Sequence, residues 1–358
     1  MNPWFFMLLI GNVATIAATP LPASLYFIKE GQIFRIEPGG IDAYPVTRCV
    51  SPVDGFDVSP GDSSLVFVSG NTLFVSDAKG KNVRDILAGP MLSKPVDEVA
   101  RLNDRASIGQ RIASPRWSPD GTRIAFIRNG LQMIDVATSL VSTVHANDPI
   151  SESSKNSLVI DGILSWSPDS NYIAVSTYRY PAASRYGMSL SLKKREEALV
   201  ELTTGADFTL AWNPDGNEAV VATASQGGAC ALMRLDVAGM RLSCIGEDVP
   251  ARSSFFYLGP SVHPRDGIRV FVGQSHSPAM APDSFIMSRI RPDGYGREEI
   301  RPERWKIQSA LWAGDGSGAA VIEADAAGDG RLLWIPASAD TMRVLAVNVS
   351  APLHWGRR

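Results

Sequence analysis

The hydrophobic positions of this chain recur in short alternating runs, separated by tight polar turns. Val, Ile, Phe and Thr dominate these runs, which predicts β-strands, and helical periodicity is almost absent. Six segments repeat one arrangement, an apolar strand, a turn and a second apolar strand. They read FDVSPGDSSLVFV, PRWSPDGTRIAFI, LSWSPDSNYIAVS, LAWNPDGNEAVVA, PSVHPRDGIRVFV and ALWAGDGSGAAVI. An internal repeat of this kind determines the predicted architecture.

The repeat has a period of about 50 residues, which suits a four-stranded sheet better than a separate domain. The aligned aromatic or apolar positions are Val58, Trp117, Trp166, Trp212, Val262 and Trp312. A second hairpin follows in most units, for example VSDAKGKNVRDIL and RLDVAGMRLSCI. Four-stranded antiparallel sheets that recur at this spacing indicate an all-β protein, a β-propeller.

The two ends of the repeat array predict how the ring closes. From Leu25 the chain supplies three strands with no first strand ahead of them, whereas the C-terminal APLHW resembles the inner strand ASPRW. We expect Ala351 to Trp355 to pair with Leu25 to Glu30 and to complete the first blade. Six full units and one shared unit therefore predict a seven-bladed propeller over residues 24–358, and closure removes exposed sheet edges.

The repeated S-P-D-G element has a structural cause. Pro presets φ at the second turn position, Asp suits the third, and Gly relieves the fourth. We therefore expect Asp120, Asp169 and Asp215 to act as turn residues in preference to metal ligands.

The N-terminal residues have the pattern of an export signal. No charged side chain occurs from Met1 to Ile28, and the apolar run WFFMLLIGNVATIA precedes TPLPAS. This pattern is typical of a signal peptide over residues 1–23, cleaved between Ala17 and Ala23. An uncleaved membrane anchor is the alternative, although the run is short for a span of about 20 apolar residues. We expect a periplasmic or secreted protein.

Charge and cysteine content narrow the partners and the compartment. Lys and Arg total 34 against 37 Asp and Glu, so nothing predicts binding to nucleic acid or to an anionic membrane. The three cysteines are Cys49, Cys230 and Cys244, and an odd count leaves at least one unpaired. Cys230 and Cys244 fall in one predicted hairpin. They either form a disulfide in an oxidising compartment or are buried thiols.

The motif SPDGTRIAF at residues 118–126, together with the hairpin DAKGKNVRDIL, resembles the WD40-like repeats of TolB-type bacterial propellers. The resemblance covers Leu25 to Trp355 and implies a bacterial envelope protein of the binding or scaffolding kind. TolB itself is implied to carry a separate N-terminal domain ahead of a six-bladed propeller. This chain offers no room for that domain, so the partner role of TolB in the Tol–Pal system is not carried over.

Long connections concentrate on one side of the predicted propeller. They lie between blades at 87–110 and 145–159, and between second and third strands at 179–187, 274–284 and 324–330. In an up-and-down blade both kinds of junction open on the same face, here named the long-loop face; the opposite face is the short-turn face. Loops on a rigid scaffold often carry function, and neutral insertion at a tolerant surface is the alternative.

Candidate binding residues on the long-loop face are Arg179, Tyr180, Arg185, Tyr186 and His276. The first four come from the segment RYPAASRYG, and Tyr and Arg are enriched at binding hot spots. The alternative is that these aromatic rings pack the loop against its own blade.

A second candidate set lies on the innermost strands, one position before the aligned residues. Asp57, Arg116 and His354 belong to consecutive blades at one level. They either form a cluster that faces the channel and binds a small ligand, with His354 as an acid or base, or they are structural. In the structural alternative, which we favour, Arg116 pairs with Asp57 and His354 latches the closing strand.

Enzyme motifs are weak in this sequence. There is no G-x-S-x-G elbow, no glycine-rich phosphate loop and no Cys or His metal spacing, and the chain has 4 His. We expect no cofactor, no metal and no catalytic residue. The favoured hypothesis is a non-enzymatic, protein-binding or scaffolding propeller of the cell envelope. The alternatives are a small-substrate enzyme of lyase or lactonase type at the channel mouth, and a sensor of carbohydrate or another ligand.

Overall fold

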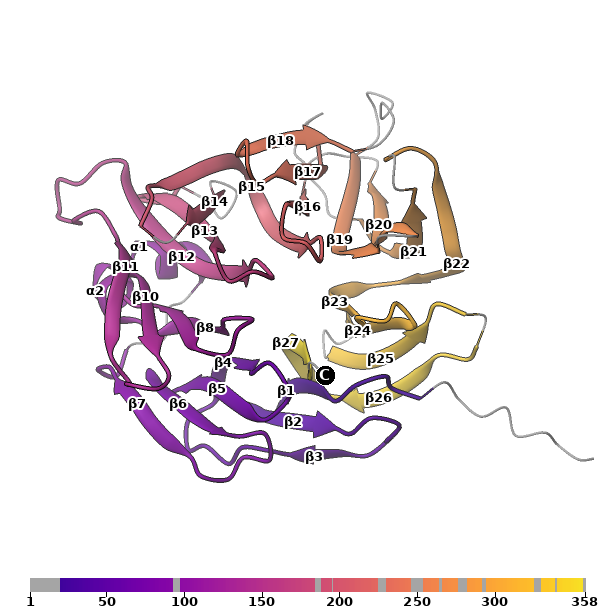
Figure 1. The fold of residues 1–358 in the computed structure, drawn as a ribbon, viewed down its shortest axis with the longest axis horizontal. Helices are drawn as coiled ribbons and strands as arrows, with labels where there is room; N and C mark the ends of the chain where they lie inside the picture. The colour runs from indigo at the N-terminus through magenta and orange to yellow at the C-terminus, as the bar shows by residue number, and fades with distance from the viewer. Residues whose placement is uncertain are drawn as a thin grey trace, which may run out of the picture.

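Seven antiparallel blades surround a central axis in the computed structural model (Figure 1). The structure describes residues 20–92, 97–183, 188–194, 196–224, 230–245, 254–263, 266–275, 282–291, 294–324, 330–338 and 340–356. Five blades are separate four-stranded sheets, and the other two share a strand in a seven-stranded sheet. The predicted seven-bladed β-propeller is confirmed.

The first four blades follow the chain from the N-terminus. Blade 1 consists of β27 (Val349–Trp355), β1 (Leu25–Lys29), β2 (Gln32–Ile36) and β3 (Ala43–Pro45). Blade 2 consists of β4 (Val53–Val58), β5 (Ser64–Ser69), β6 (Thr72–Asp77) and β7 (Arg84–Ala88). Blade 3 consists of β8 (Ala113–Trp117), β9 (Arg123–Ile127), β10 (Gly130–Asp135) and β11 (Val141–Ala146). Blade 4 consists of β12 (Ser157–Trp166), β13 (Tyr172–Tyr180), β14 (Met188–Lys194) and β15 (Leu199–Trp212).

The remaining three blades complete the ring. Blade 5 consists of β15, β16 (Glu218–Ala224), β17 (Leu232–Asp236) and β18 (Arg241–Cys244). Blade 6 consists of β19 (Ser254–His263), β20 (Gly267–Ser275), β21 (Phe285–Ile290) and β22 (Arg297–Trp305). Blade 7 consists of β23 (Ile307–Trp312), β24 (Gly318–Ala324), β25 (Gly330–Pro336) and β26 (Arg343–Val347).

The C-terminal strand closes blade 1, as the sequence predicts. Strand β27 pairs antiparallel with β1, with Leu25 opposite Trp355 and Phe27 opposite Leu353. Figure 1 shows this last, yellow strand beside the first, indigo strand. Phe27 and Leu353 are buried in a hydrophobic cluster that also contains Trp334 of blade 7. Both a hydrogen-bonded ladder and a packed core therefore join the two ends of the chain.

One strand belongs to two blades, which the sequence repeat did not predict. The first part of β15 pairs with β14 of blade 4, with Val200 opposite Leu192. Its last part pairs with β16 of blade 5, with Trp212 opposite Ala219. Blade 4 therefore continues into blade 5 without an intervening loop.

Two of the aligned tryptophans donate hydrogen bonds to the blade before their own. The indole N–H of Trp166 donates to the carbonyl of Arg116 at 3.3 Å, and that of Trp212 donates to Ser165 Oγ at 2.7 Å. Each acceptor lies on the inner strand of the preceding blade, one position before that blade's own aligned residue. The repeat in the sequence is therefore a repeat of contacts between blades.

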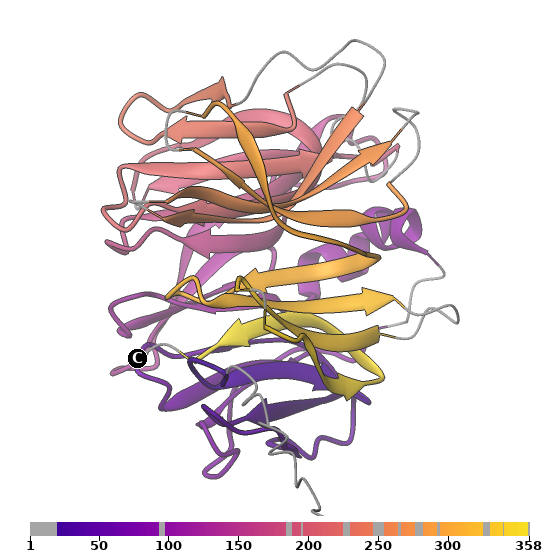
Figure 2. The same cartoon turned by 90° about the vertical axis from the view of Figure 1, so that its right-hand side faces the viewer.

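Two short helices lie in the connection between β7 and β8, and hydrophobic periodicity did not predict them. Helix α1 (Glu98–Asn103) begins after Asp97, whose side chain accepts from the Ala100 N–H. Helix α2 (Arg105–Gln110) begins after Asp104, which caps it in the same way; both caps are typical N-cap residues. Figure 2 shows the helices on the face opposite the C-terminus, the long-loop face. Within the described ranges, neither helix approaches the length and apolar character that a membrane span requires.

Candidate functional site

The inner-strand candidates meet around the carboxylate of Asp57. His354 Nδ1 lies 3.1 Å from Asp57 Oδ1, and the Trp117 backbone N–H donates to Asp57 Oδ2 at 2.7 Å. One side chain of blade 2 therefore contacts both blade 1 and blade 3. Because a buried carboxylate needs partners to offset the loss of hydration, these two contacts explain why Asp57 can be buried at this position.

Arg116 belongs to the same neighbourhood. Its guanidinium donates to the carbonyls of Phe56 at 3.4 Å and Pro115 at 2.9 Å. The His354 ring stands edge-on to Phe56, with 4.8 Å between the ring centroids. The structure thus brings Asp57, Arg116 and His354 together, as their positions on consecutive inner strands predict.

The geometry of this cluster suits a structural contact that holds the closing strand in place. An imidazole held by a carboxylate at Nδ1 is the arrangement that orients a general base. Here, however, the His354 and Asp57 side chains are only 17% and 8% exposed, and the same contact ties the closing strand to blade 2. The expectation that His354 latches the closing strand agrees with this geometry, and ligand binding by the cluster stays a prediction.

On the long-loop face, the α1–α2 segment is fixed to blade 4. Arg101 of α1 forms a two-pronged ion pair with Asp161 of β12, with N–O distances of 2.7 and 3.0 Å. Asn103 exchanges two hydrogen bonds with the backbone of Ala182, both of 2.9 Å. Bidentate Arg–carboxylate pairs are among the stronger and more directional contacts in proteins. The insertion is therefore held in one orientation by a blade from which it is distant in sequence.

A small hydrophobic cluster lies beneath these polar contacts. Leu102 of α1, Val159 and Tyr178 are buried together, and Tyr180 packs against them. The Tyr178 hydroxyl donates to the Leu102 carbonyl at 2.7 Å. Burial, with a smaller contribution from nearby Asp161, raises the pKa of Tyr178 well above its ordinary value. The phenol therefore stays a neutral hydrogen-bond donor that anchors α1.

These contacts locate the candidate residues of the long-loop face. Tyr180 packs into the cluster that holds α1, so it contacts another blade's insertion as well as its own blade. Arg179 forms an ion pair with Glu201 of its own blade at 3.1 Å and is half exposed. Arg185, Tyr186 and His276 lie outside the described residues. A binding role for any of these residues stays a prediction.

Sequence reasoning missed several exposed apolar side chains on this face. Val50 and Met91 are almost fully exposed, and Val99 of α1 is also exposed. They lie in the connections that follow blades 1 and 2, next to each other in the ring. Exposed apolar residues are common singly, and what distinguishes these three is that Val99 lies in the anchored helix α1, Met91 lies in the connection leading to it, and Val50 lies in the neighbouring connection.

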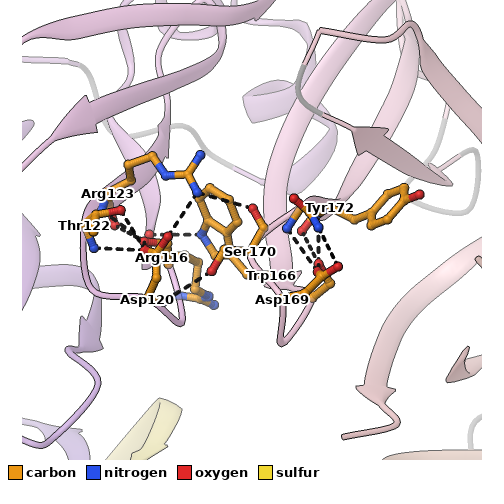
Figure 3. A network of polar contacts seen from close by, with 11 residues as sticks. Arg116, Asp120, Thr122, Arg123, Trp166, Asp169, Ser170 and Tyr172 are labelled. Carbon is orange, nitrogen blue, oxygen red and sulfur yellow. Dashed lines mark hydrogen bonds and ion pairs between the residues drawn. The ribbon is translucent and has the colours of Figure 1, made fainter. Parts of the chain in front are cut away.

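On the short-turn face, the S-P-D-G turns connect neighbouring blades. Arg123 extends from β9 over the ring of Trp166 in blade 4, 5.4 Å from its centroid, and is ion-paired with Asp120 at 3.2 Å. The guanidinium also donates to the Ser170 carbonyl of the next blade's turn. Figure 3 shows this network spanning the turns of blades 3 and 4.

The aspartates of these turns are turn residues, as predicted. Burial alone would raise the pKa of Asp120, but hydrogen bonds from Ser118, Thr122 and Arg123 outweigh it and hold the pKa well below its ordinary value. Hydrogen bonds within the turn lower the pKa of Asp169 for the same reason. Among the described residues, no group of three His, Cys, Asp or Glu side chains is placed to hold a metal ion.

The cysteines resolve into a disulfide and a free thiol. Cys230 and Cys244 are bonded, with Cα atoms 5.7 Å apart, and Cys49 is free. Cys244 lies opposite Met233 in the β17–β18 ladder, so Cys230 reaches it from just ahead of β17. Of the two alternatives left open by the sequence, the structure shows the disulfide.

Comparison with known proteins supports the β-propeller fold and no particular function. No protein-family model matches the chain, and no curated protein matches its sequence. An oligogalacturonate lyase from Vibrio parahaemolyticus is 11% identical, with a TM-score of 0.59 over 92% of this chain and 86% of that chain. A puromycin-hydrolyzing peptidase from Mycobacterium tuberculosis is 12% identical, with a TM-score of 0.58 over 93% of this chain and 53% of the peptidase. TolB from Acinetobacter baumannii is 13% identical, with a TM-score of 0.46 over 91% of this chain and 77% of TolB.

At these identities the likeness shows a shared fold alone. TolB structures are among the neighbours, but a TM-score of 0.46 is too low to assign this chain to their family. The TolB-type resemblance of the repeats therefore holds at the level of the β-propeller.

Proposed function

We propose that this chain is a non-enzymatic propeller of the bacterial cell envelope that binds a protein partner through its long-loop face. The observation that carries the proposal is the attachment of the α1–α2 segment to blade 4. The Arg101–Asp161 ion pair and the Asn103–Ala182 hydrogen bonds hold a non-propeller insertion in a fixed orientation. A surface that is already ordered loses little conformational entropy when a partner binds.

The chemistry of the fixed surface suits a protein. Val50, Met91 and Val99 supply exposed apolar area, and the Arg179–Glu201 ion pair lies at the edge of the same face. Protein interfaces combine an apolar centre enriched in Met, Arg and aromatic residues with a polar rim. A broad mixed surface of this kind supports a macromolecular partner over a small ligand.

Two features support an exported location, periplasmic or secreted. The Cys230–Cys244 disulfide is typical of oxidising compartments, and the uncharged apolar run at the N-terminus is typical of a signal peptide.

Matched substitutions on the two faces test this proposal. We would use the purified wild-type protein to capture partners from the envelope fraction of the producing organism, and then measure the affinity of the recovered protein. The variant Met91→Glu/Val99→Glu should weaken binding by more than about 1 kcal/mol, and Arg179→Ala should weaken it less. Tyr180 is not substituted because it packs against α1.

The control places the same charges on the opposite face. Val83 and Leu140 are exposed in the third-to-fourth strand hairpins of blades 2 and 3, and Val83→Glu/Leu140→Glu should leave the affinity unchanged. Equal losses from both variants, or none from the first, would reject the long-loop face.

A second candidate is acid–base chemistry at His354, which the 3.1 Å contact with Asp57 favours. The oligogalacturonate lyase neighbour makes oligogalacturonate the first substrate to assay. Turnover by the wild-type protein that is lost in a folded His354→Gln variant would support this candidate over the binding module.

A further inference from the structure

The space between two neighbouring blades at the aligned position is here called a slot. The slot between blades 5 and 6 differs from most of the others, because Val262 stands where most blades have tryptophan. Val262 lies opposite Ile268, in the same ladder position at which Trp166 lies opposite Ile173 in blade 4. The strand register therefore confirms that Val262 is the structural counterpart of the aligned tryptophans. Blade 6 carries a side chain that is smaller by an entire ring system.

In two other slots the indole fills the space between the blades under a guanidinium. Trp166 is 7% exposed, with Arg123 of the preceding blade over its ring. Trp312 is buried between blades 6 and 7, with the Arg269 guanidinium 5.8 Å from its ring centroid. In both slots the aligned position therefore holds a planar aromatic ring with a cation on its face.

Between blades 5 and 6 this position opens onto a pocket of about 240 Å³. Its apolar walls include Ala219, Val220 and Val262, and its polar rim includes Glu218, Arg234 and His263. The Arg234 guanidinium lies 3.9 Å from the Glu218 carboxylate, at the side of the pocket that belongs to blade 5. Apolar walls with a few polar groups at the rim are the usual composition of a small-molecule site.

The other aligned valine shows that a missing tryptophan does not by itself leave a pocket. Next to Val58 of blade 2, Tyr26 of blade 1 is fully buried and occupies the slot between the two blades. Blade 5 instead presents the short side chain of Val220 toward Val262, while Ala219 packs on the opposite face of the strand. The open slot is therefore a property of this pair of blades.

We propose that the slot between blades 5 and 6 binds a small aromatic molecule, whose planar ring takes the place of the missing indole. An engineered apolar cavity of about 150 Å³ is enough to hold benzene, so 240 Å³ accommodates a fused two-ring system. Arg234 lines the pocket from the third strand of blade 5, so its guanidinium is the cation available to the face of a bound ring. A cation within about 6 Å of a ring centroid is attracted to the ring face.

His263 lies at the polar rim of the pocket, with the Cε1–Nε2 edge of its imidazole beside Gly316 of blade 7. Burial, together with the positive charge of Arg269, lowers the pKa of His263 below its ordinary value. The imidazole is therefore neutral at neutral pH, with one ring nitrogen as a donor and the other as an acceptor. An aromatic molecule with a ring N–H or a hydroxyl satisfies this rim better than a plain hydrocarbon.

Titration with indole tests the proposal directly. Indole added to the ¹⁵N-labelled protein should produce saturable shifts in the amides that line the pocket, such as those of Ala219, Val220 and Gly267. Val262→Trp fills the slot from within, so it should raise Tm and weaken indole binding by at least about tenfold. Arg234→Met keeps an unbranched, flexible stem without the charged guanidinium and should weaken binding about two- to fivefold, the range of an exposed cation–π contact.

Two further variants keep the test decisive. If Val262→Trp fails to fold, Val262→Phe blocks the same space with a smaller ring and should also prevent binding. Leu140→Trp adds an indole at an exposed turn of blade 3 and should leave binding unchanged. The proposal is overturned if indole gives no saturable shifts up to its solubility limit, or if a folded Val262→Trp or Val262→Phe protein binds indole as the wild type does.

Discussion

The imidazole of His354 lies 3.1 Å from the carboxylate of Asp57, which ties the closing strand of blade 1 to the inner strand of blade 2. The same carboxylate accepts from the backbone N–H of Trp117 in blade 3. The point at which the ring closes is therefore held by a polar contact across three blades as well as by the ladder between β27 and β1. Removing each contact should therefore have a separate effect on the free energy of unfolding.

Removing the carboxylate should leave a buried donor without its acceptor. We expect Asp57→Ala to lower the free energy of unfolding by about 1–3 kcal/mol, the usual cost of an unsatisfied buried group. Asp57→Asn, which keeps one oxygen acceptor, should cost less. Urea denaturation measures both, with Asp42→Ala in an exposed turn as the control. Equal stability of Asp57→Ala and the control would show that the contact contributes nothing.

Removing the closing strand should destabilise the whole ring. A chain that stops before Ala351 loses most of β27, the partner of β1, and exposes the inner edge of β1. Leu353→Ala is a milder test of the same strand. Because Leu353 is buried, we expect this substitution to lower the free energy of unfolding by about 2–5 kcal/mol. A truncated protein with the wild-type Tm would contradict the closure.

Breaking the Arg101–Asp161 pair should release α1 locally and leave the propeller folded. The two side chains are 17% and 20% exposed, so the lone carboxylate left in Arg101→Ala would lie in a mostly buried site. We expect faster amide hydrogen exchange in residues 98–110, with little change in Tm. Arg105→Ala is the matched control, since the Arg105–Glu152 pair is largely exposed and exposed pairs contribute about 0–1 kcal/mol.

The turn carboxylates should contribute to stability in a defined pH range. The folded state holds the pKa of Asp120 below its ordinary value, so its contribution is present above the unfolded pKa of about 3.9. That contribution is lost as the pH falls toward the folded pKa. Asp120→Asn should therefore make the decline of Tm between about pH 4 and pH 2 shallower than in the wild type. Asp215→Asn changes the same turn position in blade 5, and an equally altered slope there would contradict the assignment to Asp120.

The disulfide should stabilise the outer part of blade 5. A bond that closes a loop of 14 residues removes entropy from the unfolded chain worth up to about 3 kcal/mol. Cys230→Ser/Cys244→Ser should lower the free energy of unfolding by no more than this amount, and Cys49→Ser should have a smaller effect. Alkylation in denaturant should modify one thiol without reductant and three with it; three without reductant would show that the bond is absent.

Sequence periodicity predicted most of the fold because the repeat records contacts between blades. The aligned tryptophans and the APLHW strand identified the seven blades and the closing pair, since every blade must contact its neighbour in the same way. The sequence did not predict that β15 is continuous. The spacing between blades 4 and 5 is ordinary, and no turn residue shows where one blade ends and the next begins. Leu21, just ahead of the predicted start at residue 24, is buried in the core cluster of blades 1 and 7.

The candidate sites were harder to predict because they depend on contacts between distant segments. Adjacent positions on inner strands were enough to bring His354 and Asp57 together. Nothing in the local pattern showed that Arg101 would reach Asp161, 60 residues away, although Asp97 and Asp104 marked two helix starts. The pocket beside Val262 depends on what blade 5 presents across the slot, which alignment of the repeats alone does not report.

The adjacency of Leu25 and Trp355 also determines where the ring can be opened. Because these residues lie opposite each other in one sheet, a short flexible linker could join Trp355 to Leu25 without moving a strand. New ends placed near Met91, in the connection between β7 and β8, would interrupt only a surface segment. New ends within β15 would cut a strand that two blades share. We therefore expect a circularly permuted chain to fold when its new ends lie after blade 2, and not when they lie between blades 4 and 5.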